Sequence, residues 1–364
     1  MLLRRTLLGT AIATTLATPV AFAETTLGGY GELHYNNLEN TAADGTTSDS
    51  RSMDFHRFVL EFSHDFNDHI RFFSELELEH AFLKDTDTDT DGTSTNINKS
   101  KGEVELEQAY IEIDLDDSSR VKAGVFLIPV GLINETHEPP AFYGVERNLV
   151  EKEIIPATWW EGGIMYSAHT DFGLSYDLAI HSGLNTTDGS IRDGRKKVSE
   201  APATALAYTA RVKYTGISGL ELAATAHQQD DLSQGTTAAD ADSATLLETH
   251  VVYTLNALKF TALHAGWDID GIAGTTAGQN DDRQNGNLIE VSYKINEKLG
   301  VAVRNSQWHT KVDRDKSQNL IALNYWPHED VVFKVDYQDE EYDNVTGNST
   351  RSVKGFNLGV GYQF

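Results

Sequence analysis

Charged side chains at every second position are the residues of this sequence best suited to chemistry. Arg211 and Lys213 alternate with apolar neighbours, and Glu290 and Lys294 repeat the pattern further along the chain. This spacing places such side chains on one face of an extended strand. Because an unpaired charge is costly to bury, that face is expected to be wet. The basic residues of the same parity are Arg57, Arg71, Lys122, Arg211, Lys213, Lys294, Arg304 and Lys334.

Two other patterns resemble metal or catalytic sites but do not complete one. Residues 85–92, DTDTDTDG, match the start of an EF-hand loop, but Asn98 stands at the twelfth position where Glu is required. Weak binding of a divalent cation by this acidic segment stays open. The 13 histidines are scattered, and no H-E-x-x-H, G-x-S-x-G, Walker or Rossmann motif occurs. We therefore predict no catalytic residue, no metal site, no cofactor and no enzymatic activity.

The elements that must position these charges are strands. Alternation of apolar and polar residues recurs along the whole chain, whereas patterns with the 3.6-residue period of a helix are nearly absent. This predicts an all-β protein. The expected sixteen strands lie at 26–36, 53–64, 69–82, 103–115, 119–127, 162–169, 173–182, 203–215, 219–229, 244–255, 257–268, 286–295, 298–309, 317–326, 330–342 and 353–364.

The connections between these strands alternate in length. Short turns such as 65–68 and 116–118 follow even-numbered strands, while long polar connections such as 37–52 and 183–202 follow most odd-numbered ones. An even strand count with this asymmetry is typical of a bacterial outer-membrane barrel. We therefore predict a 16-stranded antiparallel transmembrane β-barrel over residues 24–364, wide enough to hold a water-filled channel. Closure also pairs every backbone group, as lipid requires.

The face of each strand can be assigned where the alternation is clean. Near the C-terminus, apolar residues at every second position point to lipid and leave Lys334 and Asp336 inside. Strand 257–268 stays ambiguous, because Phe260 and Trp267 lie on opposite faces. Acidic residues of the inward parity are about as numerous as basic ones: Glu32, Glu61, Glu75, Glu77, Glu79, Glu112, Glu221, Glu248, Glu290 and Asp336.

The N-terminus and the overall charge indicate where the protein acts. Residues 1–23 have a positive start, a short apolar stretch and the small-x-small sequence Ala21-Phe22-Ala23, which predicts a cleaved signal peptide and export to the outer membrane. The chain has no Cys, so no disulfide can stabilise it. The formal net charge of −26 excludes a nucleic-acid partner. The expected partners are outer-membrane lipid, lipopolysaccharide and small hydrophilic solutes or anions.

The longest connection joins the fifth and sixth strands at 128–161. It contains aromatic and branched apolar residues, so we predict that it folds into the lumen and narrows the bore. Its charges are mixed: Arg147 and Lys152 lie close in sequence to Glu146 and Glu151. Carboxylates in a constriction favour cations, and Arg or Lys favours anions, so the ion preference stays open.

Three segments around this connection resemble the phosphate-selective porin family. They are KAGVFLIPVG at 122–131, VERNLV at 145–150 and GGIMYS at 162–167. The resemblance implies a trimeric 16-stranded channel in which basic side chains guide anions, with Arg147 as the loop arginine and Lys122 as the basic residue before the glycine motif. A general or cation-preferring porin remains an alternative reading, and an outer-membrane barrel enzyme is a more distant one.

Overall fold

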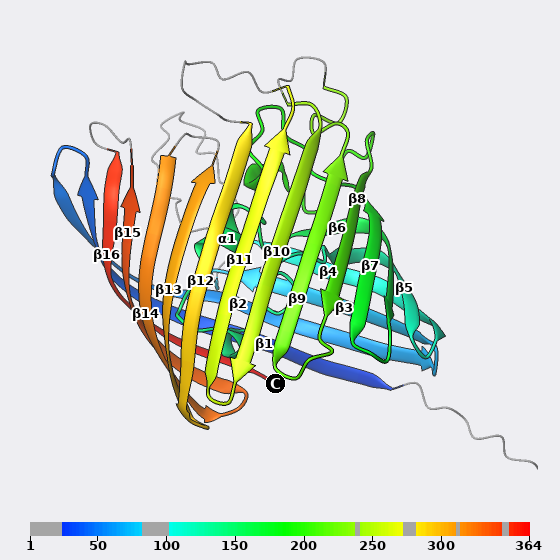
Figure 1. The fold of residues 1–364 in the computed structure, drawn as a ribbon, viewed down its shortest axis with the longest axis horizontal. Coiled ribbons are helices and arrows are strands. Elements are labelled where there is room, and N and C mark those ends of the chain that lie inside the picture. The colour runs from blue at the N-terminus through cyan, green and yellow to red at the C-terminus, as the bar shows by residue number, and fades with distance from the viewer. Residues whose placement is uncertain (1–23, 82–101, 237–240, 272–281, 311–313, 344–348) are drawn as a thin grey trace, which may run out of the picture.

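The sheet of this protein closes on itself into a barrel. The computed structural model describes residues 24–81, 102–236, 241–271, 282–310, 314–343 and 349–364. The predicted signal peptide at 1–23 and the acidic segment at 85–92 lie outside these residues. Each strand pairs antiparallel with its neighbours in sequence, and the first strand pairs with the last. Figure 1 shows the tilted strands, with tight turns such as that between β10 and β11 at one end and longer connections at the other.

The sixteen predicted strands are all present. Their bounds are β1 Thr25–Ala42, β2 Thr47–Asn67, β3 Ile70–Glu79, β4 Val104–Asp116, β5 Ser119–Leu127, β6 Trp160–His169, β7 Leu174–His181, β8 Ala207–Tyr214, β9 Leu220–Gln229, β10 Ala244–Leu255, β11 Leu258–Ile269, β12 Arg283–Asn296, β13 Leu299–Thr310, β14 Arg314–His328, β15 Val331–Tyr342 and β16 Thr350–Gln363. The all-β, 16-stranded prediction is confirmed.

One predicted loop is wrong. The polar segment 37–52 is not a long connection, because β1 and β2 continue through it as a hairpin and leave only residues 43–46 between them. Asn40 pairs with Ser48 and Thr41 with Thr47. Both strands are polar along this stretch, so backbone pairing extends where apolar alternation gives no signal. Gly45, at a φ of +86°, allows the tight turn.

Side-chain exposure confirms the predicted facing. On β15, Phe333 and Tyr337 are half exposed on the outside, while Lys334 and Asp336 are buried inside. The ambiguous strand β11 turns Phe260 outward and Trp267 inward. The inner wall of the barrel is therefore not polar throughout. On β11, apolar side chains such as Trp267 face inward because they pack against the connection between β5 and β6.

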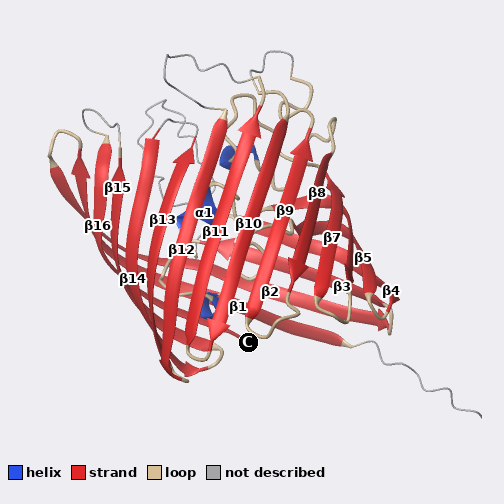
Figure 2. Cartoon of the chain, in the orientation of Figure 1, coloured by secondary structure: helices blue, strands red, loops and turns tan. Residues whose placement is uncertain are grey.

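The helical content is small. Among the described residues it consists of α1 (Leu149–Glu153) and two 3-10 turns, η1 (Pro139–Ala141) and η2 (Arg192–Gly194). Figure 2 draws them as short blue segments among the red strands. Within the described ranges, no helix is long and apolar enough to cross a membrane. Both α1 and η1 belong to the connection between β5 and β6, which carries the site.

Candidate functional site

The connection between β5 and β6, residues 128–159, forms a defined structure and is called the inner loop below. Its two ends meet, because Ile128 N donates to Trp159 O (3.0 Å). Asn134 holds both ends from its side chain: Nδ2 donates to the carbonyl oxygens of Ile128 (2.8 Å) and Trp159 (2.9 Å), and Oδ1 accepts from Trp159 N (2.7 Å). Asn134 is fully buried, so water does not compete for these bonds.

Glu151, one of the loop charges expected at the constriction, is fully buried within the inner loop. Its side chain accepts hydrogen bonds from the backbone N–H groups of Leu132 (2.6 Å) and Ile133 (2.8 Å) and from Asn148 Nδ2 (2.6 Å). Burial raises the pKa of Glu151, and these donors limit the rise. Gly131 has a φ of +71°, and a β-carbon there would overlap the Glu151 carboxylate. Glu151 therefore organises the loop.

The last strand is shaped to receive the inner loop. Pro139 lies over Gly361, where a β-carbon would overlap its ring, and Val145 lies over Gly359, where a β-carbon would crowd it at 3.2 Å. Asp336 on β15 accepts a hydrogen bond from Val145 N (2.6 Å). Gly359 and Gly361 on β16 therefore form an inward-facing groove, called the glycine groove below, in which the loop rests.

The opposite side of the inner loop packs on apolar wall residues. Val150 and Ile154 are fully buried, and the Trp159 ring lies 6.0 Å from that of Trp267. Trp267 Nε1 donates to Ile154 O (2.7 Å). Burying side chains of this size stabilises the loop by roughly 1.5–3 kcal/mol each. The side chain of Trp267 thus faces the lumen because it packs against the inner loop there.

Two predicted basic residues of the bore bind the inner loop instead of standing free in water. Arg304 Nη2 donates to Tyr143 O (2.6 Å), and Nε donates to Glu290 Oε2 (2.8 Å). Lys334 Nζ lies 3.5 Å from the centre of the Phe142 ring, a cation–π contact in a buried setting. Both cations hold the position of the loop.

A buried ion network joins the inner loop to the wall formed by β1–β4. His137 Nε2 lies 3.5 Å from Glu107 Oε2 and 3.6 Å from Glu75 Oε1. Burial alone would lower the pKa of His137, but these carboxylates outweigh it and raise the pKa to about 10. Arg57, predicted to line the lumen, donates to Glu32 Oε1 (2.6 Å) and to His137 O (3.3 Å). Arg57 is 1% exposed, so it stabilises the packing of the wall and does not face the water of the lumen.

The remaining loop charges are only partly buried. Arg147 Nη1 donates to Thr158 Oγ1 (2.6 Å). Glu146 Oε1 lies 3.1 Å from His34 Nδ1 on β1. Lys152, on α1, is also partly exposed. These three are the loop charges of the predicted set that retain access to water.

Three basic residues surround one carboxylate on β4. Glu112 Oε1 lies 3.0 Å from Arg71 Nη1 and 3.5 Å from Arg120 Nη1, and Glu112 Oε2 lies 3.9 Å from Lys122 Nζ. Asp65 pairs with Arg71 as well (2.7 Å). The sequence predicted Arg71 and Lys122, but Arg120 was missed although it shares the parity of Lys122.

The same wall continues as a cavity of about 330 Å³. Arg211 Nη2 lies 2.8 Å from Asp177 Oδ2, and Arg211 Nη1 pairs with Glu135 of the inner loop. Its neighbour Lys213 is partly exposed. Four basic residues line this cavity: Arg120, Lys122, Arg211 and Lys213.

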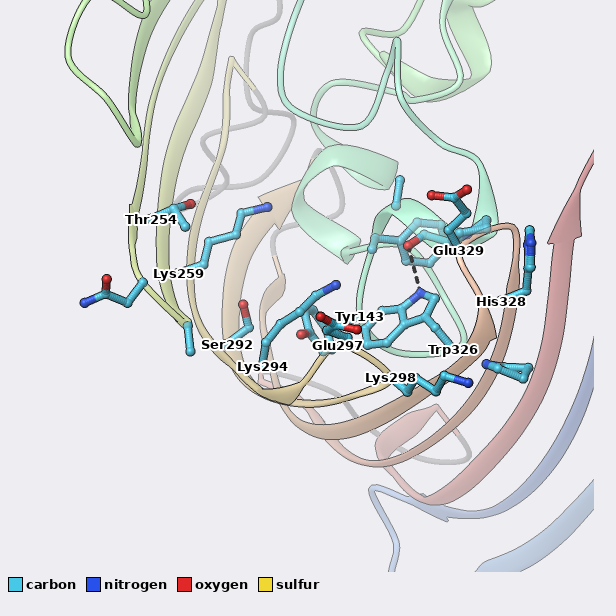
Figure 3. Close-up of a pocket in the computed structure, with 16 residues that line it drawn as sticks. Tyr143, Thr254, Lys259, Ser292, Lys294, Glu297, Lys298, Trp326, His328 and Glu329 are labelled. Atoms are coloured by element: carbon cyan, nitrogen blue, oxygen red, sulfur yellow. Dashed lines mark hydrogen bonds between the residues drawn. The ribbon is translucent and has the colours of Figure 1, made fainter.

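A larger cavity of about 640 Å³ lies between the inner loop and the tight turns of β10–β15 (Figure 3). Lys259, Lys294 and Lys298 line it and are exposed. Lys294 Nζ sits 4.6 Å from the centre of the Trp326 ring, and Trp326 Nε1 donates to Pro140 O of the loop (3.4 Å). Lys294 was predicted to face inward, while Lys259 and Lys298 adjoin turns where parity is hard to assign.

A second connection lies over the inner loop. This connection comprises residues 182–206, of which 183–202 were predicted as a long polar loop. Two of its arginines donate hydrogen bonds to backbone carbonyl groups of the inner loop. Arg195 Nη1 donates to Thr158 O (2.6 Å) and Pro156 O (3.0 Å), and Arg192 Nη1 donates to Lys152 O. This docking could not be predicted, because the acceptors are backbone carbonyl groups, which every residue carries.

A barrel wall that holds a folded loop across its lumen is the architecture of a porin, and the comparisons with known proteins agree. The family model of phosphate-selective porin O and P matches residues 27–307. The chain belongs to this family. It is therefore an outer-membrane channel and not an enzyme.

Relatives of this porin extend over nearly the whole chain. An uncharacterised protein of Aquifex aeolicus (strain VF5) is 27% identical over 371 residues, which cover 88% of this chain and 77% of the relative. The anion-selective porin from Comamonas acidovorans has a TM-score of 0.63 at 12% identity, covering 94% of this chain and 100% of that one. OmpF of Salmonella typhi, solved with daunomycin, has a TM-score of 0.57 at 14% identity, covering 94% and 98%. These structures share its fold.

Proposed function

We propose that this porin is a passive diffusion channel that favours small hydrophilic anions over cations. The observation that carries the proposal is the cavity lined by Arg120, Lys122, Arg211 and Lys213, where Glu135 and Asp177 are the carboxylates. Basic residues outnumber acidic ones there, and Arg or Lys around a water-filled passage favours anions.

The larger cavity supports the same preference. Three lysines line it, together with Glu297 and Glu329. The described ion pairs of the chain include none for Lys259, Lys294 or Lys298. Cations without a fixed carboxylate partner are free to attract a passing anion. The family supports phosphate or a similar oxyanion as the solute class.

The sign of the reversal potential in a salt gradient tests this proposal. The untagged protein is reconstituted in a planar lipid bilayer between unequal KCl solutions. We expect stepwise conductance and a reversal potential that favours chloride. A potential that favours potassium, or none, would establish the alternative of a cation-preferring or general porin. Inorganic phosphate at the same ionic strength is then expected to reduce the chloride current.

We also propose how the mature channel is made and assembled. Removal of residues 1–23 would leave Glu24 as the N-terminus, and the barrel would sit in the outer membrane in contact with lipid and lipopolysaccharide. A homotrimer is supported by the family and by a solved trimer form of OmpT from Vibrio cholerae, which has a TM-score of 0.53. The mass of the purified chain tests the cleavage, and native mass spectrometry in detergent tests the trimer.

A further inference from the structure

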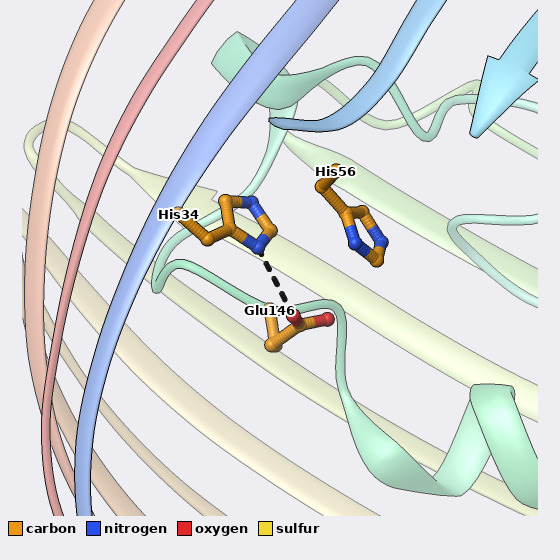
Figure 4. Close-up of side chains that lie close together, drawn as sticks. All are labelled: His34, His56 and Glu146. Atoms are coloured by element: carbon orange, nitrogen blue, oxygen red, sulfur yellow. Dashed lines mark hydrogen bonds and ion pairs between the residues drawn. The ribbon is translucent and has the colours of Figure 1, made fainter. Parts of the chain in front are cut away.

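Three histidines distant in sequence converge on the inner wall beside the inner loop. His34 lies on β1, His56 on β2 and His80 directly after β3. The His34 and His56 rings stack with centres 4.7 Å apart, and the His56 and His80 rings meet edge to face at 5.7 Å. Glu146 of the inner loop completes one side of the group, as Figure 4 shows.

The donor atoms of His34, His56 and Glu146 are spaced for a metal ion. One donor atom from each lies within 4.8 Å of the others. His34 Nδ1 and Glu146 Oε1 are 3.1 Å apart. Ligands at zinc distances of 2.0–2.1 Å in tetrahedral geometry are separated by roughly 3.3 Å, so small side-chain rotations would close the site. Two imidazoles and a carboxylate suit a borderline divalent ion such as Zn²⁺.

Asp54 is placed to orient the histidines. Its Oδ2 lies 3.3 Å from His56 Nδ1 and 2.8 Å from His80 Nδ1. A carboxylate on one imidazole nitrogen fixes the ring and leaves the other nitrogen for a metal, as in many zinc sites. Since His56 Nδ1 faces Asp54, His56 Nε2 is the nitrogen available to the ion.

Two further observations point to a ligand at this place. The His34 side chain is 4% exposed, and its Nε2 pairs with Glu32 Oε2 at 3.1 Å, which fixes the ring and leaves Nδ1 facing Glu146. The Glu146 and His56 side chains are 31% and 21% exposed, so an ion can reach the group from the water of the lumen. A carboxylate on the far nitrogen of each imidazole, beside an approach open to water, is the arrangement in which histidines hold a metal ion.

We propose that His34, His56 and Glu146 bind a divalent transition-metal ion of the Zn²⁺ class inside the lumen, with Asp54 as the residue that positions His56. The cluster of Glu75, Glu107 and His137 is a weaker candidate. All three of its side chains are buried, and the His137 imidazole already pairs with both carboxylates, so an ion would have to displace a formed ion network.

Zinc titration of the untagged barrel tests the site independently of the ion selectivity proposed above. The folded protein, freed of metal by a chelator, is titrated with Zn²⁺ by calorimetry at neutral pH. We expect saturable binding of one ion per chain. The His34→Gln/His56→Gln double variant should lose this binding, and His56→Gln alone should weaken it at least tenfold.

The control variant is His264→Gln, which removes a histidine from the outward face of β11, where its ring meets Asn287. It should bind Zn²⁺ like the parent protein. Retention of the heat-modifiable band on gels checks that each variant folds. Co²⁺ gives a second readout, because a tetrahedral nitrogen and oxygen site shows intense visible absorption. Absence of saturable binding in the parent, or unchanged binding in the folded double variant, would overturn the proposal.

Discussion

The guanidinium Nη2 of Arg304 lies 2.6 Å from the carbonyl oxygen of Tyr143, which joins the wall of the barrel to a loop 161 residues away in sequence. Arg304 is 6% exposed and pairs with Glu290 on the neighbouring strand. A basic residue that parity alone assigns to a water-filled bore is thus an anchor for the loop.

Replacing Arg304 by Ala should release this side of the inner loop. The change removes the bond to Tyr143 and leaves Glu290 unpaired, and breaking a buried pair in this way costs about 3–5 kcal/mol. We expect noisier single-channel currents and faster proteolysis within 128–159. Arg351→Ala, at an exposed position on β16, is the control. Single-channel currents without added noise, together with an unchanged rate of proteolysis within 128–159, would show that Arg304 does not anchor the loop.

Replacing Glu151 by Gln should destabilise the inner loop although the two side chains have the same size. The new amide would face Asn148 Nδ2, a donor opposite a donor, and Asn148 cannot rotate because its Oδ1 accepts from Glu151 N (2.9 Å). An unsatisfied buried donor costs roughly 1–3 kcal/mol. Urea unfolding followed by tryptophan fluorescence measures the loss. Glu153→Gln, a partly exposed position on the same helix, should leave the midpoint unchanged.

The docking of His137 should depend on pH with a defined sign. Its pKa in the folded state is about 10, above the unfolded value of about 6.5. The stabilisation by protonated His137 is therefore fully present below pH 6.5 and is lost as the pH rises towards 10. Unfolding free energies from pH 6 to 10 should fall in the parent. In His137→Gln they should be lower throughout and flatter across this range, and equal slopes in the two proteins would contradict the assignment.

Reversing the charge of Lys122 should shift selectivity towards cations. Lys122 lines the basic cavity and shares Glu112 with Arg71 and Arg120. A Lys122→Glu change removes the excess of positive charge at this cavity and leaves three basic residues beside three carboxylates. The reversal potential in a KCl gradient should move towards potassium, and Arg147→Ala should move it less in the same direction. Lys196→Glu, away from this cavity, serves as the control, and no shift in Lys122→Glu would remove this wall from the selectivity mechanism.

Deleting Phe364 should impair assembly before it alters conductance. Phe364 N donates to Gly29 O (2.9 Å), and Gly29 N donates to Phe364 O (3.0 Å), so the last residue pairs with the first strand. The yield of folded barrel in outer-membrane fractions measures the effect. Extension of the chain by a C-terminal Ser is a milder comparison. Normal yield after the deletion would contradict this role.

The strands could be predicted because lipid imposes a pattern that repeats with a period of two. Phe333 and Lys334 alternate correctly for this reason. Closure of the predicted barrel requires the first strand to pair with the last, and in the structure Leu33 pairs with Val360 and Tyr35 with Leu358. The hairpin around Gly45 could not be predicted, because its two strands are polar and are paired by backbone hydrogen bonds, which do not depend on side-chain type.

The site was less predictable than the barrel. Sequence parity assigns Arg57, Arg304 and Lys334 to the lumen, but it does not say that the inner loop covers them, since contacts between distant segments are not periodic. The histidine cluster has one local signal, Asp54 and His56 on one face of a strand, two residues apart. His34, His80 and Glu146 reach it only through the curvature of the wall and the path of the loop.

The glycine groove on β16, formed by Gly359 and Gly361, links the position of the inner loop to closure of the barrel. Pro139 and Val145 rest on Gly361 and Gly359 of β16, the strand that closes the barrel against β1. The surface that receives them exists only once the final strand has joined its neighbours. The inner loop can therefore take its final position, and the passage its final width, only in a barrel that has closed.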